Sequence, residues 1–191
     1  MSHDLAPDEQ ATVAAIRHDG RTDIDDLLVA FVEQQRLAGR RVLGLVMKHR
    51  DRGEGCRAAM VLTDIDTGEE YLVSQALGSE SASCSADPQG FARASRVLRD
   101  ALDRSPDLVV CNRFGSLEAT NGGFVAELLA LLERGIPVLT VVAPAHIDAW
   151  RRFIGEAPLL PIDPVAWAAW LDAVLLQRDR SAEVPARVAP A

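Results

Sequence analysis

Short apolar runs alternate with segments of helical periodicity along most of this chain, and no other feature of the sequence constrains the fold as strongly. Four runs are apolar almost throughout, as in strands that are buried on both faces. They lie at residues 13–16, 41–47, 107–111 and 136–143. Apolar residues recur at helical spacing in the segments from about 23 to 39, 87 to 104, 124 to 133, 145 to 153 and 165 to 176. The alternation predicts a three-layer α/β fold with a mostly parallel sheet that helices cover on both faces.

The middle of the chain departs from this rhythm. Residues 57–63 and 70–73 have strand composition and are separated by a strong turn signal, so we expect an antiparallel hairpin extension of the sheet. Residues 78–85 are small and polar and predict a loop. The Asp87-Pro88 pair that follows is typical of a helix start, with the aspartate as N-cap.

At 191 residues the chain has the length of one domain. We expect a single α/β domain over residues 12–177, with a disordered segment at 1–11 and a flexible tail at 178–191. Inside the domain, residues 112–123 are predicted to form a loop and residues 158–164 a linker.

The formal net charge of −8 argues against a protein whose main task is to hold nucleic-acid phosphates or an anionic membrane. No apolar run is long enough for a membrane span, and the first residues lack the layout of a signal peptide, so we expect a cytoplasmic protein. Cys56, Cys84 and Cys111 are widely spaced and odd in number. They predict neither a disulfide framework nor a metal site.

The loop after the first predicted strand has nearly the pattern of a phosphate-binding loop. Residues 15–22 match [AG]xxxxGK[ST] at every position except the lysine, which is an arginine here. Such a loop binds phosphate through backbone N–H groups and the start of the next helix. The pattern predicts a site for an anion or a nucleotide, with candidate residues Arg17, His18, Asp19, Gly20, Arg21, Thr22 and Asp23.

A second alignment matches the helix rather than the glycine. It places Ile24 at the lysine position, with Asp25 and Asp26 in place of the hydroxyl residues that hold magnesium. We favour this alignment because it starts the helix where the apolar periodicity starts. Together with Asp23, the two carboxylates would repel a triphosphate. The alternative to a ligand site is then a polar loop that only resembles a phosphate cradle.

The strand that faces such a loop in phosphoryl-transfer ATPases ends in acidic residues that hold magnesium and position water. Here the predicted strand is followed by Asn112 and Arg113, and an arginine suits anion binding better than hydrolysis. Both are candidate ligand-binding residues. Glu118, further along the same segment, is the candidate catalytic residue, and an exposed loop carboxylate is the alternative interpretation.

The serine-rich segment before Asp87 offers a second place for an anion. Hydroxyls and backbone amides ahead of a helix are what a tetrahedral oxyanion such as molybdate, tungstate, sulfate or phosphate needs. The candidate residues are Ser81, Ser83, Cys84 and Ser85. A flexible connection with an incidental thiol is the alternative, and the nearby Glu80 counts against an anion.

The order of these motifs resembles known families. Its strand, phosphate-type loop, helix, meander and later strand ending in N-R-F-G-S-L-E are similar to the small bacterial and archaeal P-loop nucleoside triphosphatases. More closely, roughly residues 12–176 resemble a bacterial family of unknown function often encoded beside molybdate-transport genes. The stretches that carry this are D-I-D-D-L-L at 23–28, S-x-S-C-S-A-D-P at 81–88, N-R-F-G-S-L-E at 112–118 and G-I-P-V-L-T at 135–140. The resemblance implies a three-layer P-loop-like fold and a link to molybdenum handling.

Three functions are consistent with these patterns. The first, which we favour, is a degenerate P-loop-like binding or regulatory protein that recognises a small anionic ligand, either a nucleotide or an oxyanion such as molybdate or tungstate. The second is an active nucleoside triphosphatase with Mg²⁺, in which Arg21 replaces the lysine and Glu118 positions water. The third is an interaction module with a vestigial site, a homodimer formed through the C-terminal helix that carries Trp167 and Trp170.

Overall fold

The computed structural model describes residues 11–50, 59–76 and 84–183. Within these ranges, seven strands form one sheet in the order β4-β3-β2-β7-β8-β1-β9, and β5 and β6 form a separate pair. The strands are β1 (Val13–Arg17), β2 (Val42–Arg50), β3 (Ala59–Asp64), β4 (Glu70–Leu72), β5 (Ser74–Ala76), β6 (Cys84–Ala86), β7 (Leu108–Phe114), β8 (Val138–Val142) and β9 (Leu159–Leu160). The helices are α1 (Ile24–Leu37), α2 (Pro88–Ala101), α3 (Ser116–Ala119), α4 (Val125–Glu133), η1 (Pro144–His146), α5 (Ile147–Ile154) and α6 (Pro164–Glu183).

The directions of the strands confirm the predicted fold class. β2, β7, β8, β1 and β9 pair in parallel, whereas β3 and β4 continue the sheet beyond β2 in antiparallel directions. The extension is the hairpin that the turn signal between the two middle segments predicts. β1, β7 and β8 consist almost wholly of buried residues, because helices cover both of their faces.

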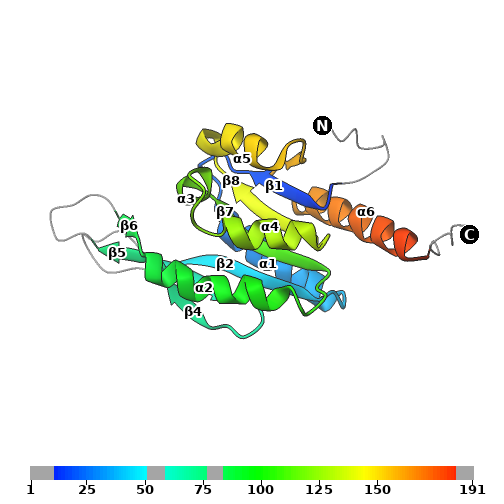
Figure 1. Ribbon diagram of the computed structural model, residues 1–191, viewed down its shortest axis with the longest axis horizontal. Helices are drawn as coiled ribbons and strands as arrows, with labels where there is room; N and C mark the ends of the chain where they lie inside the picture. Colours follow the sequence, from blue (N-terminus) through cyan, green and yellow to red (C-terminus); the bar gives the residue numbers. More distant parts are fainter. Residues whose placement is uncertain (1–10, 51–58, 77–83, 184–191) are drawn as a thin grey trace, which may run out of the picture.

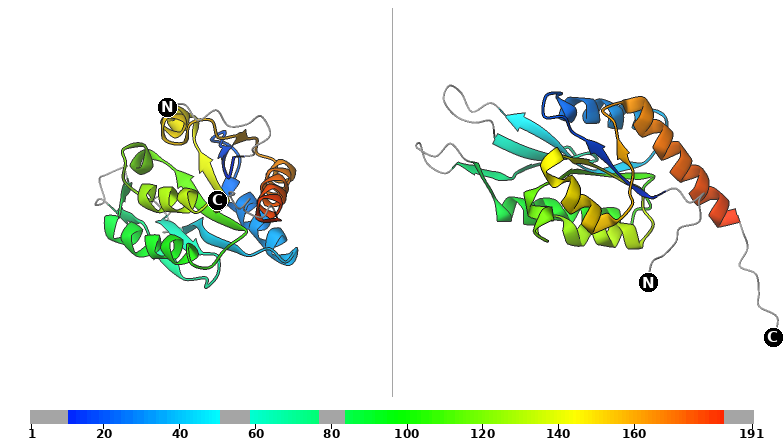
Figure 2. Two further views of the ribbon diagram at one scale, coloured as in Figure 1. Left: turned by 45° about the vertical axis from the view of Figure 1, so that its right-hand side comes forward. Right: turned by 90° about the horizontal axis from the view of Figure 1, so that it is seen from above.

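Helices cover the sheet in two layers (Figures 1 and 2). α2, α4 and α5 lie on one face, where Leu98, Leu128 and Trp150 are part of the first buried apolar cluster. α1 and α6 lie on the other face, where Phe31 and Trp167 belong to the second cluster. The parallel strands contribute alternate side chains to the two clusters, as the period of two in a strand requires. The result is the expected three-layer arrangement.

The tryptophans of the C-terminal helix belong to this core. Trp167 is fully buried and meets the ring of Phe31 edge to face, with 5.4 Å between ring centroids. Trp170 is 4% exposed and its ring N–H donates to the carbonyl of Ala11. These two side chains are therefore packed within the chain, and a homodimer formed through this helix stays a prediction.

Several segments hold more regular structure than the sequence predicts. β7 continues through Phe114, and α3 follows it inside the predicted 112–123 loop. β9 lies in the predicted 158–164 linker, because Leu159 and Leu160 pair with β1. The last helix extends to Glu183, so residues 178–183 are helical rather than a loose tail, and Arg178 is held there by the carboxylate of Asp107 at 2.7 Å. Residues 1–10 of the predicted disordered segment at 1–11 lie outside the described residues.

Among the helices that the structure describes, none is long and apolar enough to cross a membrane.

Candidate functional site at the carboxyl edge of the sheet

The carboxyl ends of three neighbouring parallel strands meet at one edge of the sheet. Arg17 at the end of β1 and Phe114 at the end of β7 both align with Val142, the last residue of β8 between them. The loops that follow β1 and β7 are thus two strand spacings apart, about 10 Å. The N–H of His18 donates to the carbonyl of Val142 at 2.9 Å, which fixes the first loop to this edge. In open α/β sheets, ligands bind outside this edge, so it is the place to look for function.

The first loop is closed by its own carboxylate. Oδ1 of Asp19 accepts hydrogen bonds from the backbone N–H groups of Arg21 and Thr22, both at 2.9 Å, and Oδ2 accepts from the hydroxyl of Thr22 at 2.9 Å. These bonds lower the pKa of Asp19 to about 2, the backbone N–H of Thr22 contributing most. Gly20 turns the chain between them with a φ of +75°. Backbone amides that would cradle a phosphate in a P-loop are here bound to a side chain of the loop itself.

The helix after this loop begins where the favoured alignment places it. α1 starts at Ile24, with Asp23 as N-cap accepting from the N–H of Asp26 at 3.4 Å. Ile24 is 1% exposed and packs in the core between the sheet and α1. On the favoured alignment, an apolar, buried side chain would stand where a P-loop has its lysine. Arg17 and Arg21 are exposed, and His18 is half-buried with Nε2 3.2 Å from the carbonyl oxygen of Thr22.

A bulge near the end of β7 determines where its polar residues face. Cys111 aligns with Thr140 of β8, and Arg113 aligns with the very next residue, Val141, so Asn112 is an extra residue on β7. In an unbroken strand, Arg113 would face the same side as Cys111, whose side chain packs in the cluster under α2 and α4. The extra residue reverses the alternation, so Arg113 faces α1 instead.

Arg113 and Asp25 form an ion pair across this edge. Nη2 of Arg113 donates to both carboxylate oxygens of Asp25, at 2.9 and 3.1 Å. The side chain of Asp25 is 7% exposed and that of Arg113 is 32% exposed. Relative to a P-loop triphosphatase, the charges are reversed: the helix carries the acid and the strand carries the base. The pair fastens the second loop to the first turn of α1.

Two polar groups beside this pair are buried without a partner. Asn112 is 2% exposed. Neither the nitrogen nor the oxygen of its side-chain amide has a hydrogen-bond partner. Nε of Arg113 is likewise buried and unpaired. Buried donors and acceptors are nearly always satisfied in folded proteins, so these groups mark an unusual place in the molecule.

Glu118 is buried rather than exposed. Its Oε2 accepts from the N–H of Gly115 at 2.9 Å, and its Oε1 accepts from the N–H of Phe124 at 3.1 Å. Gly123 approaches so closely that a Cβ atom there would lie 1.9 Å from Oε1. Both carboxylate oxygens therefore fix the backbone conformation of the segment between β7 and α4. A catalytic role for Glu118 stays a prediction, and these two bonds give the side chain a structural task.

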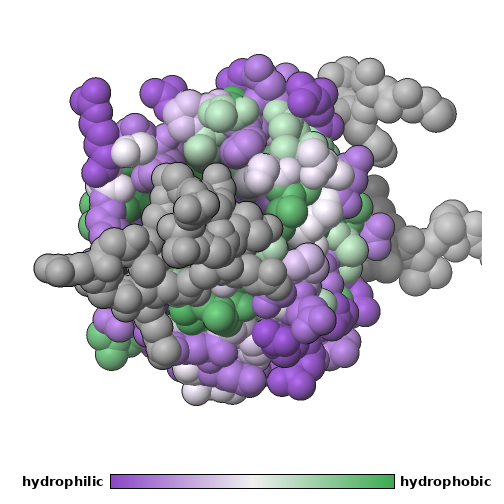
Figure 3. All heavy atoms as spheres, turned by 90° about the vertical axis from the view of Figure 1, so that its left-hand side faces the viewer, coloured by the Kyte–Doolittle hydropathy of each residue, from purple (hydrophilic) through white to green (hydrophobic). Residues whose placement is uncertain are grey.

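Two surface hollows border this end of the molecule. One, of about 380 Å³, is lined by Arg17, Asp19 and the apolar segment around β9. The other, of about 470 Å³, lies among α3, α4 and α5, and Glu118 and Arg152 line part of it. Figure 3 shows this side of the molecule. On the described surface that is visible there, hydrophilic residues predominate, with smaller hydrophobic patches between them.

The serine-rich alternative site is only partly described. Ser81 and Ser83 lie outside the described residues. Cys84 and Ser85 belong to β6, where they pair with Ala76 and Gln75 of β5, so this part is a strand and not the predicted loop. The helix start that follows is confirmed: Asp87 is the N-cap of α2 and accepts from the N–H of Gln89 at 3.0 Å.

No group of three or more His, Cys, Asp or Glu side chains that could hold a metal ion occurs in residues 11–50, 59–76 and 84–183. Cys111 is fully buried, and burial raises the pKa of its thiol well above the usual value. It is the small core residue that its place at the end of an apolar run indicates.

Sequence reasoning found the two loops but missed their internal partners. Asp19 was expected as a ligand contact, and its bonds to the loop amides were not foreseen, although an aspartate two and three residues before polar residues is a common turn signal. Asp25 was considered only as a source of repulsion. Its partner lies 88 residues away, at a bulge that no local pattern announces.

Comparison with known proteins places the chain in a family. A model of the family described as "Protein of unknown function (DUF2478)" matches residues 13–170. The Molybdenum import ATP-binding protein ModC 2 of Bradyrhizobium diazoefficiens is 37% identical over 155 residues, which are 81% of this chain and 17% of that protein. The chain thus spans less than one fifth of the length of this relative.

A solved structure shares the fold. The crystal structure of THEP1 from the hyperthermophile Aquifex aeolicus superposes with a TM-score of 0.52 over 86% of this chain and 96% of that one, at 16% sequence identity. Together with the strand order and the helices on both faces, this similarity gives the fold as a P-loop nucleoside-triphosphatase-like α/β fold.

Proposed function

The chain belongs to the DUF2478 family, and from that premise we propose that it is a P-loop-like binding or regulatory protein that recognises a small anion without hydrolysing a nucleotide. The observation that carries this proposal is the ion pair between Asp25 and Arg113. The following points support it.

Hydrolysis of a nucleoside triphosphate needs positive charge on the phosphates and an acidic group for magnesium on the facing strand. In this chain the helix start presents Asp25, and the facing strand presents Arg113. The two charges neutralise each other at 2.9 Å, and Ile24 stands where a lysine is required. We therefore expect no phosphoryl transfer, because the lysine and the acidic group on the facing strand are both missing. The strand and the helix start that would position these groups are retained.

Binding of an anion remains compatible with the same edge. Arg17 is exposed and lines the hollow of about 380 Å³, and exposed Arg21 and half-buried His18 belong to the same loop. An anion there would compete with the carboxylate of Asp19, which already occupies the N–H groups of Arg21 and Thr22. We therefore expect contacts through the side chains of the loop, and weak rather than tight binding.

Molybdenum handling is the process that the relatives suggest. The name of the Bradyrhizobium protein states molybdenum import and ATP binding, and it shares 37% of its residues with this chain over the matched region. We carry over the first of these as a proposal, with molybdate or tungstate as the anion. The matched region is 17% of that protein, so its ATP binding is no argument for ATP as the ligand here.

Two measurements on the purified chain test the proposal. Phosphate release from ATP and GTP, with and without Mg²⁺, is expected to stay at the level of a blank. Calorimetric titration with sodium molybdate, tungstate, sulfate and ATP is expected to detect binding of at least one anion, which Arg17→Ala weakens. Turnover above the blank that Glu118→Gln abolishes would establish the triphosphatase instead, and no binding of any of the four would leave the vestigial interaction module.

A substitution that neutralises one carboxylate of the loop makes the titration more specific. Asp19→Asn keeps an oxygen that can accept from the N–H groups of Arg21 and Thr22 but removes the negative charge, so it is expected to strengthen anion binding. Asp163→Asn is the matched control, because Oδ1 of Asp163 accepts from the N–H of Val165 at 2.9 Å at the start of α6. The control is expected to leave anion binding unchanged.

A further inference from the structure

We propose that Asn112 and Arg113 form the receptor for a tetrahedral oxyanion, and that the carboxylate of Asp25 is an internal competitor that holds this receptor closed. The inference rests on the proposed function, because it names the groups that would bind the anion. It adds a gate. The carboxylate of Asp25 occupies Arg113 when no ligand is bound, and an oxyanion must displace this carboxylate to bind.

The first argument is the set of hydrogen-bond donors that lack an acceptor. Nδ2 of Asn112 and Nε of Arg113 are both buried and have no partner. They belong to adjacent residues at the bulge of β7, so they occur at one point of the sheet edge. An unpaired buried donor is costly, and an oxyanion oxygen is the acceptor that suits both an amide N–H and a guanidinium N–H. No other part of β7 combines unpaired donors with a cation.

The second argument is the way Asp25 holds the guanidinium. Both of its oxygens accept from the same guanidinium nitrogen, Nη2, at 2.9 and 3.1 Å. A guanidinium binds a carboxylate or an oxyanion best through two nitrogens in parallel, and here Nε, which could complete such a pair, is left unused. Asp25 therefore neutralises the charge of Arg113 but leaves one of its N–H donors, Nε, without an acceptor.

The third argument is access. About a third of the Arg113 side chain is exposed, whereas the Asp25 side chain is 7% exposed. An anion from solution can approach the guanidinium from the outside while the carboxylate contacts it from the α1 side. Asp25 lies in the first turn of α1, where the helix dipole favours a negative charge. The helix dipole offsets part of the cost of separating this carboxylate from Arg113, so an anion must bind the guanidinium more strongly than Asp25 does.

The test is a calorimetric titration of Asp25→Asn with sodium molybdate and, separately, sodium sulfate. Removal of the competing charge is expected to raise the affinity for oxyanion roughly tenfold over the unmodified chain, equivalent to about 1.4 kcal/mol. The double variant Asp25→Asn/Arg113→Met is expected to lose this gain. Glu127→Gln is the matched control, since it breaks a pair of similar geometry between Arg99 and a carboxylate that is 9% exposed, at 2.7 Å, away from the loops.

The outcomes separate this inference from the proposed function. A gain in Asp25→Asn that disappears in the double variant, with no gain in Glu127→Gln, supports the gate. Binding by the unmodified chain that Arg17→Ala abolishes, with no change in Asp25→Asn, overturns the gate and leaves the proposed function intact. Absence of binding in all variants overturns both.

Folding of the variants is checked by circular dichroism and thermal melting before titration. If Asp25→Asn does not fold, Arg113→Lys in the unmodified background provides the decision. The lysine keeps the charge and lacks Nε, so loss of oxyanion binding supports the receptor, and unchanged binding overturns it.

Discussion

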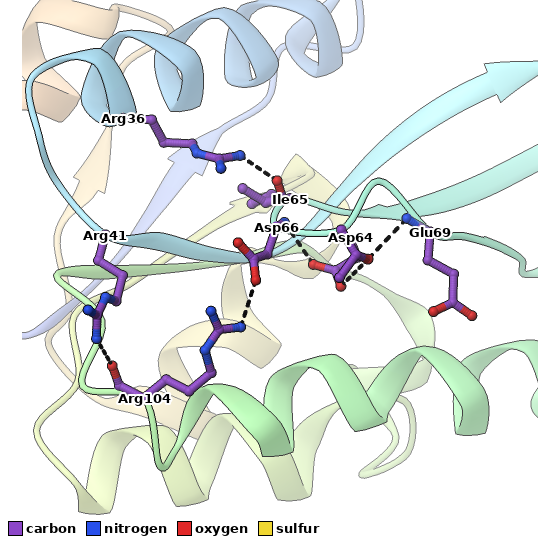
Figure 4. Close-up of polar contacts among 8 residues, drawn as sticks. Arg36, Arg41, Asp64, Ile65, Asp66, Glu69 and Arg104 are labelled. Atoms are coloured by element: carbon purple, nitrogen blue, oxygen red, sulfur yellow. Dashed lines mark hydrogen bonds and ion pairs between the residues drawn. The ribbon is translucent and has the colours of Figure 1, made fainter.

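The two ends of the sheet differ in which backbone groups their charged side chains bind. At the carboxyl edge, carboxylates bind backbone N–H groups: Asp19 holds the first loop and Glu118 holds the second. At the amino edge, shown in Figure 4, arginines bind backbone carbonyls: Arg36 donates to Ile65 and Arg41 donates to Arg104. Loops ahead of helices expose N–H groups, and turns at the other end also expose carbonyls. The amino edge therefore uses arginines in addition to carboxylates, since Asp64 and Asp107 accept from backbone N–H groups there.

The two edges also differ in how completely they are satisfied. The turn at the amino edge is closed from within: Asp64 accepts from the N–H of Asp66 and from the hydroxyl of Thr67, and Arg104 pairs with Asp66 at 2.8 Å. The carboxyl edge contains the unpaired groups of Asn112 and Arg113. The hydroxyl of Thr63, next to the amino-edge turn, is also buried without a partner. The carboxyl edge differs in that its unpaired groups include a guanidinium nitrogen, which leaves capacity for an anion.

Among these tests, removal of the Glu118 carboxylate is expected to cause the largest loss of unfolding free energy. Glu118→Ala leaves the N–H groups of Gly115 and Phe124 without an acceptor in a buried place, which costs about 3 kcal/mol of unfolding free energy. Urea denaturation measures it. Glu118→Gln retains one carbonyl oxygen and is expected to lose less. Equal stability of Glu118→Ala and the unmodified chain would show that the carboxylate does not hold the loop.

Arg113→Met comes next. It leaves the carboxylate of Asp25, which is 7% exposed, without its cation. Fully buried pairs lose roughly 3–5 kcal/mol on such a change, and we expect about 2 kcal/mol here because Arg113 is partly exposed. Denaturant midpoints of Arg113→Met and Asp25→Asn compared with their double variant give the coupling between the two side chains. A coupling near zero would contradict the ion pair as a link between β7 and α1.

Arg104→Ala at the amino edge is expected to cost less. The pair with Asp66 is half-exposed on both sides, so its loss amounts to under about 1 kcal/mol. Added salt is expected to reduce this cost further, whereas the cost of Arg113→Met responds less to salt. If Arg104→Ala were as damaging as Arg113→Met, the distinction between the two edges would fail.

The smallest expected effect is a loss of stability at acidic pH, as Asp19 becomes protonated. The folded-state pKa of Asp19 is about 2, below its ordinary value of 3.8, so its stabilising contribution is present above pH 4 and is lost as the pH falls towards 2. Asp19→Asn is expected to flatten the loss of stability in this window. Asp107 at the amino edge also has a lowered pKa: partial burial opposes the shift, and bonds from the N–H of Arg41 and from Arg178 outweigh it. Thermal melts of Asp19→Asn and Asp107→Asn between pH 2 and 5 show which edge responds first.

The sequence predicts the framework well because the framework depends on local patterns. Apolar periodicity gave the parallel strands, the antiparallel extension and the start of α1, and the Asp87-Pro88 pair gave the start of α2. β9 was not predicted, because two residues carry no periodicity and become a strand only by pairing with β1. The ion pair of Asp25 and Arg113 depends on a contact 88 residues apart, and no local rule reaches that far.

The bulge in β7 has a consequence for how this family can vary. One extra residue, Asn112, sets the parity of everything after it, so that Arg113 faces α1 and Phe114 meets the ring of Trp150 on the opposite side. A homologue that kept the extra residue in a regular strand, without the bulge, would turn its arginine to the other layer. Deletion of Asn112 would instead leave the arginine opposite Val141, still facing α1, and would remove only the buried amide. A gap at this position in a related sequence is therefore expected to coincide with a regular strand that keeps both the arginine and the acid on α1.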